Sequence, residues 1–264
     1  MSDLRASSIA SLSLLRHLPL LLRAVPGTPL RVLAIMALDT VHIIRLARPM
    51  PRDRIAQLAS FLNFQACTNA ALDHKCLCQA DYETLERRLE LAGLRSRMDT
   101  YLNGLRDLES RRPPIGGDWR SFDEVRRYRE GVVRFSLAAI VAIGFDTASL
   151  EDATVEIDRD GNLDALFHIA LQCQVIDDVL DYSQDLAAGL PSFLTATDSS
   201  PESLLLTAGL ARSYGSRPHS TGHVALPIRL VLSLITAITT LVVETARGRN
   251  SQTHSCGMAQ SQRI

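Results

Sequence analysis

The stretch QVIDDVLDYSQD, Gln174 to Asp185, places four carboxylates in an otherwise apolar helical pattern. Asp177, Asp181 and Asp185 follow one another at four-residue steps, and Asp178 stands beside the first of them. Because a helix advances about 100° per residue, steps of four drift by only about 40°, so these three residues are expected along one helix face. Apolar flanks bury much of this helix, where like charges repel and lose hydration. Arginine or Mg²⁺ would offset that cost. A solvated face with a chance run of aspartates is the alternative.

The same helical period runs through most of the 264-residue chain, with no sustained alternation of period two. The pattern therefore predicts an all-α fold, with one helical domain over residues 30–246. Prolines, glycines and polar runs divide it into segments. The expected helices cover residues 30–46, 53–79, 81–92, 95–110, 122–145 and 163–186.

The composition is that of an ordinary folded protein. Apolar residues make up 46% of the chain and the formal net charge is −1, which argues against disorder and against nucleic acid as the main partner. The five cysteines are an odd number, and most lie in apolar helical contexts. This usage favours a reducing, cytoplasmic compartment over a disulfide framework.

The two ends of the chain raise the question of a membrane. Residues 1–29 form an apolar and basic segment, since four arginines and no acid lie between Asp3 and Asp39. An amphipathic helix on a membrane surface is one reading, and an ordinary first helix packed on the core is the other. Near the C-terminus, Leu230 to Val243 gives 14 uninterrupted apolar or hydroxyl residues, short of the roughly 20 that a spanning helix needs. A buried or membrane-docked helix is expected there, followed by a disordered tail over residues 247–264.

The segment QVIDDVLDYSQDLAAGLPS, residues 174–192, resembles the second metal motif of class I isoprenoid synthases. Gln174 followed by the pair of aspartates and Asp181 matches the trans-polyprenyl synthases, although Cys173 stands where that family has an aromatic residue. The DxxxD of squalene and phytoene synthases, with a glycine after it, is matched by Asp181, Asp185 and Gly189. The stretch YREGVVRFSLAAIVAIG, residues 128–144, is similar to the preceding helix of squalene and phytoene synthases, where a tyrosine leads into a run of small residues ending in glycine. The resemblance covers about residues 53–195.

This resemblance implies a helical bundle around a central apolar cavity and a Mg²⁺-dependent enzyme acting on a prenyl diphosphate. The metal ligands that it implies on this helix are Asp177, Asp178, Asp181 and Asp185. Asp177, Asp181 and Tyr128 are the implied catalytic residues. Ionisation would give an allylic cation that a second prenyl alkene, or an alkene of the same chain, captures. The low aromatic content, 5%, favours prenyl transfer over cyclisation, which uses aromatic ring faces to guide cations.

A class I site also requires a second acidic wall, and the candidate is NFQACTNAALDHKCLCQADY. Asp73 is its best match by position, with Asn69 four residues before it. No DDxxD or compact DxxxD is present, so this wall departs from the family pattern. Asp81 lies eight residues further on, and capping of the next helix is its simpler explanation. Lys75 (the chain's one lysine) and His74 are expected as cationic donors to diphosphate.

Three further side chains complete the predicted substrate site. Arg129 and Arg134 lie on the helix between the two acidic walls in sequence, and either guanidinium suits bidentate binding of a diphosphate. Gln174 belongs to the second motif. Salt bridges of the two arginines with Glu130 or Asp123 are the alternative.

Two other metal patterns fit poorly. His74, Cys76 and Cys78 do not all point the same way on a helix, so zinc is not expected. The segment EIDRDGNLDAL superficially resembles a calcium loop with ligands at alternate positions: Asp158, Asp160, Asn162 and Asp164. It has Leu163 where that loop needs glycine and Ile169 where it needs glutamate. Helix capping by Asp160 or Asn162 is the better account.

Two other classes of function stay open on the sequence. The incomplete first wall, and the loss of the family-like pattern after about Ser213, are typical of a helical protein that has lost catalysis and serves as a binding or partner subunit. The basic N-terminal segment and the apolar run after Leu230 indicate instead a membrane-associated helical protein.

Overall fold

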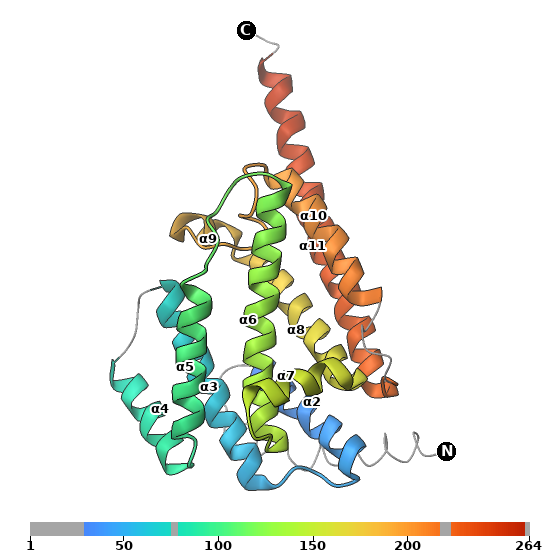
Figure 1. Ribbon diagram of the computed structural model, residues 1–264. Helices are drawn as coiled ribbons and strands as arrows, with labels where there is room; N and C mark the ends of the chain where they lie inside the picture. The colour runs from blue at the N-terminus through green and yellow to red at the C-terminus, as the bar shows by residue number, and fades with distance from the viewer. Residues whose placement is uncertain (1–28, 75–78, 217–222, 262–264) are drawn as a thin grey trace. The chain divides into compact units, whose positions relative to one another are not determined.

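The computed structural model describes residues 29–74, 79–216 and 223–261, and the side chains of residues 31–72, 82–216 and 223–248. Every regular element in these ranges is an α-helix, so the predicted all-α fold is confirmed (Figure 1). The helices are α2 (Pro29–Leu46), α3 (Arg52–His74), α4 (Gln79–Leu91), α5 (Arg95–Glu109), α6 (Trp119–Phe145), α7 (Leu150–Arg159), α8 (Gly161–Leu180), α9 (Tyr182–Ala188), α10 (Ser200–Ser216) and α11 (Leu226–Ser261).

The predicted boundaries differ from the observed ones in three places. The helix expected over residues 163–186 is divided at Asp181 into α8 and α9. Helices α7 and α10 occupy stretches for which no helix was predicted. Helix α11 continues to Ser261, into the segment expected to lack regular structure. The first difference changes the geometry of the candidate site.

The chain forms two compact units, which share several helices. Unit 1 comprises Met1–Ser110, Val132–Phe167 and His219–Arg229, and unit 2 comprises Arg111–Gly131, His168–Pro218 and Leu230–Ile264. Helices α6, α8 and α11 each begin in one unit and end in the other.

Unit 1 is built around an aromatic cluster. Phe61 and Phe64 of α3 lie 5.4 and 6.4 Å from the ring of Tyr101 on α5, and Phe135 of α6 stacks on the same ring at 5.4 Å. Gly104 allows this approach, because a Cβ there would come within 2.3 Å of the Phe135 ring. The Tyr101 ring, which is fully buried, therefore joins α3, α5 and the second half of α6.

Charged residues of unit 1 fix helix ends. Asp39 of α2 accepts the backbone N–H of Met50 at 2.7 Å in the turn before α3. Arg54 and Arg97 both donate to Asp146, which follows the last residue of α6. Asp160 accepts the N–H groups of the second and third residues of α8, so its predicted capping role is confirmed.

In unit 2, helices α10 and α11 run side by side (Figure 1). A Cβ at Gly215 of α10 would lie 2.3 Å from the Thr236 side chain of α11, so the two backbones are close. Gln172 of α8 donates to the Thr236 hydroxyl at 2.9 Å, and Arg212 pairs with Glu244. One side of α11 is thereby fixed to α8 and α10.

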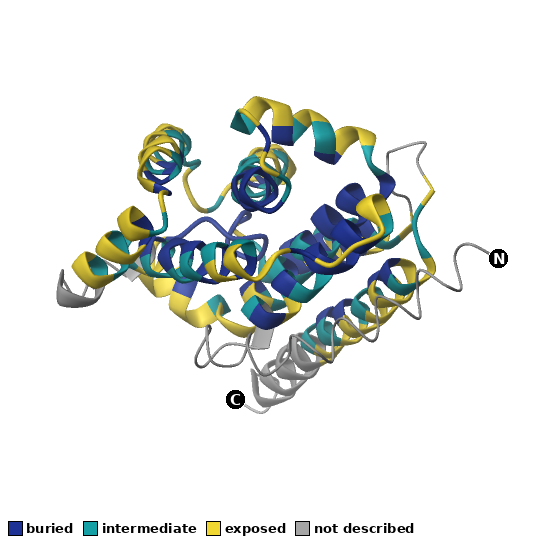
Figure 2. Cartoon of the chain, turned by 90° about the horizontal axis from the view of Figure 1, so that it is seen from below, coloured by how far each residue is buried: buried dark blue, intermediate teal, exposed yellow. Residues whose placement is uncertain are grey.

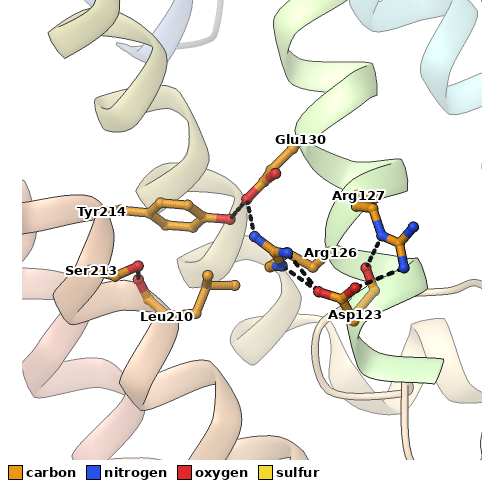
Figure 3. A network of polar contacts seen from close by, with 7 residues as sticks. All are labelled: Asp123, Arg126, Arg127, Glu130, Leu210, Ser213 and Tyr214. Carbon is orange, nitrogen blue, oxygen red and sulfur yellow. Dashed lines mark hydrogen bonds and ion pairs between the residues drawn. The ribbon is translucent and has the colours of Figure 1, made fainter. Parts of the chain in front are cut away.

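A polar network joins the start of α6 to α10 (Figure 3). The Tyr214 hydroxyl donates to Glu130 at 2.8 Å, and Arg126 bridges Glu130 and Asp123. Burial, and then the Glu130 carboxylate, raise the pKa of Tyr214 above its usual range. The hydroxyl therefore stays protonated and remains a donor to Glu130.

Candidate functional site

The predicted carboxylate row is divided by a break in the helix. Asp181 adopts φ −99° and ψ 11° between α8 and α9, and α9 turns away from the axis of α8 (Figure 1). Asp177 and Asp181 are exposed, whereas Asp178 and Asp185 are buried. The expectation of one face carrying Asp177, Asp181 and Asp185 therefore does not describe the site. The structure instead pairs one buried and one exposed carboxylate on each side of the break.

Asp178 is a buried carboxylate whose two oxygens both accept hydrogen bonds. One oxygen accepts from the Arg129 guanidinium at 3.2 Å and from the Gln174 amide at 2.7 Å. The other accepts the backbone N–H of Phe193 at 2.7 Å. Burial raises the pKa of Asp178, and Arg129 with these two donors opposes the rise. Asp178 thus connects α6, α8 and the segment after α9.

Asp185 lies in the first turn of α9 and is only 9% exposed. Burial, and then the charge of Asp178, raise the pKa of Asp185 to about 6, while Arg129 and a hydrogen bond with Ser192 lower it. An aspartate with such a pKa is partly protonated near neutral pH. Its raised pKa reflects burial first and the neighbouring charge of Asp178 second.

The charges around the break do not balance. Asp181 raises the pKa of both buried aspartates, so its carboxylate lies near them. Arg129 is the cation that lowers both values. Arg129 therefore pairs with Asp178 and acts on Asp185 through its charge. On the other side of α8, Asp177 raises the pKa of the Cys173 thiol after the larger effect of burial.

Arg129 retains an unused donor. Its Nε–H is buried and has no hydrogen-bond partner among the described residues, although a terminal nitrogen of the same guanidinium pairs with Asp178. A buried donor left without a partner is uncommon in native proteins. An acceptor of a bound ligand would satisfy it.

The segment 190–197, LPSFLTAT, is buried although it is not helical, and it follows the helix predicted over residues 163–186. Side-chain hydroxyl groups form hydrogen bonds with the backbone N–H and C=O groups of this segment. Thr195 accepts the N–H of Ser192 at 2.8 Å and donates to the carbonyl of Leu190 at 2.7 Å. The carbonyl of Thr195 accepts the N–H of Gly116. The alternation of apolar and hydroxyl residues was the signal for this buried segment.

The remaining predicted substrate residues are distributed over both units. Gln174 positions Asp178, and Tyr128 lies half-buried on α6, next to Arg129. Arg134 belongs to unit 1, where it pairs with Asp158, and its guanidinium lies 4.5 Å from the centre of the Phe167 ring. The arginine that pairs with Asp123 and Glu130 is Arg126 rather than either predicted one.

The proposed first metal wall lies mostly outside the described side chains. Asp73 and His74 are the last residues of α3, but only their backbone is described. Lys75 and the two cysteines of the zinc pattern fall within residues 75–78, which the structure does not describe. The side chain of Asp81 is likewise not described. The roles of these residues stay predictions.

Mg²⁺ has a partial donor set at the α8–α9 break. Among the described side chains, no three His, Cys, Asp or Glu residues converge on a common metal position. Mg²⁺, however, is usually held by one or two carboxylates together with water and substrate phosphate oxygens, not by a complete protein cage. The exposed carboxylates of Asp177 and Asp181 fit that mode, whereas both oxygens of Asp178 are already engaged by protein donors.

No protein-family model, curated protein or solved structure matches this chain.

Proposed function

We propose that the protein is a class I isoprenoid synthase that ionises a prenyl diphosphate with the help of Mg²⁺. The observation that carries this proposal is the gathering of Asp178, Asp181 and Asp185 at the α8–α9 break, where Arg129 pairs with Asp178. Repulsion among buried carboxylates is costly unless a cation offsets it. A divalent cation that also binds phosphate oxygens supplies the missing charge.

The exposed carboxylates of Asp177 and Asp181 are the metal ligands in this proposal. Bound there, Mg²⁺ neutralises the diphosphate and makes it a better leaving group. Asp178 holds Arg129 in place, so that the unpaired Nε–H of the guanidinium is available to a diphosphate oxygen. Asp185 contributes a carboxyl that loses its proton as positive charge approaches.

The reaction breaks the bond between the allylic carbon and the diphosphate oxygen, and the electron pair leaves with the diphosphate. The resulting cation is captured by an alkene, and loss of a proton completes the product. An apolar surrounding protects the cation from water. Whether the alkene belongs to a second prenyl chain or to the same one decides between prenyl transfer and cyclisation.

The test is release of diphosphate from farnesyl and geranylgeranyl diphosphate, with and without Mg²⁺, with mass analysis of the extracted products. The Asp177→Ala and Asp181→Ala variants should lose Mg²⁺-dependent release, while their helical circular dichroism stays nearly unchanged because both side chains are exposed. Glu124→Ala, which removes an exposed carboxylate of α6, is the matched control and should retain activity. Equal activity in all of these proteins would contradict the assignment.

The first wall can be tested in the same assay. Asp73→Ala should reduce release more than Asp81→Ala, since Asp73 is the better positional match to the family's first motif. The reverse ranking would replace Asp73 by Asp81 as the ligand of that wall.

A catalytically inactive binding protein is the second candidate. The complete engagement of Asp178 by protein donors favours it, because that carboxylate needs no ligand to be satisfied. Such a protein would bind a prenyl diphosphate, as seen by calorimetry, and release no diphosphate.

A further inference from the structure

Helix α11 has one side packed against the protein and another side that is apolar and exposed. Leu232, Thr239 and Val243 are buried, and Thr236 and Glu244 bond to α8 and α10. The other side exposes five large apolar residues, with exposed fractions of 40–68%. In Figure 2 this helix, which leads to the C-terminus, carries exposed and buried positions on different sides. These residues, which we call the α11 stripe, are Leu230, Val231, Leu234, Ile238 and Leu241. Exposed apolar patches of this kind mark interaction sites.

The exposed side of α11 is wide and carries no charge between Arg229 and Glu244. With about 100° per residue, the exposed positions from Ser233 around to Val231 cover an arc of about 160°. Within that arc, Ser233 and Ala237 are the exposed residues outside the stripe. No ionisable group lies on this surface from Leu230 to Val243.

The width of this arc favours lipid over a second protein helix. Two helices that pair in water use a narrow apolar seam with charged residues on both flanks. These charged residues contact solvent and determine which partner helix binds. The α11 stripe has no such flanks. A bilayer requires none, because its acyl region accepts an apolar surface of any width. The most apolar 18 residues within Leu226–Gly248 have a mean hydropathy of 2.1, and only 22% of them are buried.

The length of the uncharged part of α11 and its contacts with α8 and α10 oppose a bilayer-spanning arrangement of this helix. Leu226–Gly248 is long and apolar enough for a span by length and composition alone. Its uncharged part, however, covers 14 residues, or about 21 Å, against a hydrocarbon thickness of about 30 Å. A spanning arrangement would also break the hydrogen bond from Gln172 and the pair with Arg212, and would expose Glu244 to lipid.

We propose that the α11 stripe docks this protein onto a lipid bilayer, with α11 lying in the plane of the membrane surface and its packed side remaining on α8 and α10. The contact is apolar, so it forms on zwitterionic as well as anionic lipid. This docking is independent of the proposed reaction, since the α11 stripe contains none of the four aspartates at the α8–α9 break, which form the carboxylate cluster: Asp177, Asp178, Asp181 and Asp185.

The test is flotation of the full chain with vesicles of phosphatidylcholine, alone and mixed with phosphatidylglycerol. The wild-type chain should float with both. The Leu234→Glu/Leu241→Glu variant should reduce the fraction bound by at least about tenfold, because two apolar side chains leave the contact. Leu91→Glu/Leu205→Glu adds the same charge at exposed leucines of α4 and α10, and should float as the wild type does. Circular dichroism of both variants verifies the fold.

Four results would overturn the inference. Absence of flotation by the wild-type chain rules out docking, and equal flotation by the stripe variant places the contact elsewhere. Retention of the wild-type chain on membranes after an alkaline carbonate wash shows that α11 spans the bilayer. Conversion of a wild-type dimer to a monomer by Leu234→Glu/Leu241→Glu, with no vesicle binding, assigns the α11 stripe to a second copy of this chain.

Discussion

Asp178 connects three separate parts of unit 2 through hydrogen bonds. It accepts hydrogen bonds from α6, from α8 and from the buried segment 190–197 at once. Its neighbour Asp177 points to solvent. Two adjacent carboxylates therefore lie in opposite environments, one buried and hydrogen-bonded by the protein and the other exposed.

Asp178→Ala should lower the free energy of unfolding by about 3–5 kcal/mol, because it leaves a buried guanidinium and a backbone N–H without their acceptor. Asp177→Ala should change it by less than about 0.5 kcal/mol, as is usual at an exposed position. Urea unfolding of both variants measures the difference. Similar losses in the two variants would show that Asp178 does not hold unit 2 together.

Asp185 should make stability depend on pH. Its pKa is raised from 3.8 to about 6 in the folded chain, so the folded state keeps a proton that the unfolded state has released. Its contribution is fully present below about pH 4 and is lost as the pH rises through 6. The total change is at most about 3 kcal/mol.

Asp185→Asn removes this titration and should raise stability at pH 7 relative to the wild type, with the two proteins converging near pH 4. Urea unfolding between pH 4 and 8 follows this difference. A wild-type slope that survives in Asp185→Asn would assign the titration to another group, of which Asp178 is the first to test since its pKa is also raised.

The residue types of the carboxylate cluster were predictable from the sequence, and their environments were not. Regular helical geometry puts Asp177, Asp181 and Asp185 on one stripe. The break at Asp181 and the buried segment after α9 change which of them are covered. Asp178 was expected beside the row and is instead its most buried member. Burial of this kind depends on contacts between distant segments, such as Phe193 with Asp178, which local periodicity does not contain.

At the scale of helices, close packing decides the effect of glycine substitutions. Gly104 of α5 faces the Phe135 ring of α6, whereas Gly209 of α10 has nothing within 4 Å of the position of a Cβ. Alanine is the better helix former at both positions by about 1 kcal/mol. Only the surroundings distinguish the two sites.

Gly104→Ala should destabilise the protein by about 1–3 kcal/mol, because the new methyl group forces the Phe135 ring from its stack on Tyr101. Gly209→Ala should stabilise it by up to about 1 kcal/mol. Thermal unfolding of the pair, measured together, separates packing from helix propensity. Stabilisation by both substitutions would show that α5 and α6 are not in close contact.

Helices with long apolar periodicity were predicted well and interrupted ones were not. The predictions for residues 30–46, 95–110 and 122–145 agree closely with α2, α5 and α6. The division between α8 and α9 was not predicted because Asp181 is neither glycine nor proline, the residues that usually mark a helix end. The change of direction is small in hydrogen-bond terms, since the bonds from Asp181 N–H to Asp177 and from Asp185 N–H to Asp181 are kept. Helix α10 was missed because its start, SPES, reads as a continuation of the preceding loop.

At the scale of the whole chain, the two units share helices α6, α8 and α11. A break in a shared helix should therefore affect both units. Gly131→Pro, placed within α6 at the boundary between them, should cost about 3 kcal/mol or more and increase amide hydrogen exchange in α5 and in α10 alike.

Gly209→Pro is the control for this experiment, because α10 lies within unit 2 alone. Its first effect on exchange should fall in unit 2. Faster exchange of only one unit in Gly131→Pro would show that the units unfold separately despite the shared helix.

The interleaving of the two units also has a genetic consequence. The chain passes from one unit to the other after residues 110, 131, 167, 218 and 229, so neither unit is encoded by one continuous segment of the gene. Neither can be cloned by trimming the gene from one end, nor exchanged with another gene by a single crossover. A deletion of residues 1–110 preserves all of unit 2, but it still carries the unit 1 segments 132–167 and 219–229, which would be left without the rest of their core.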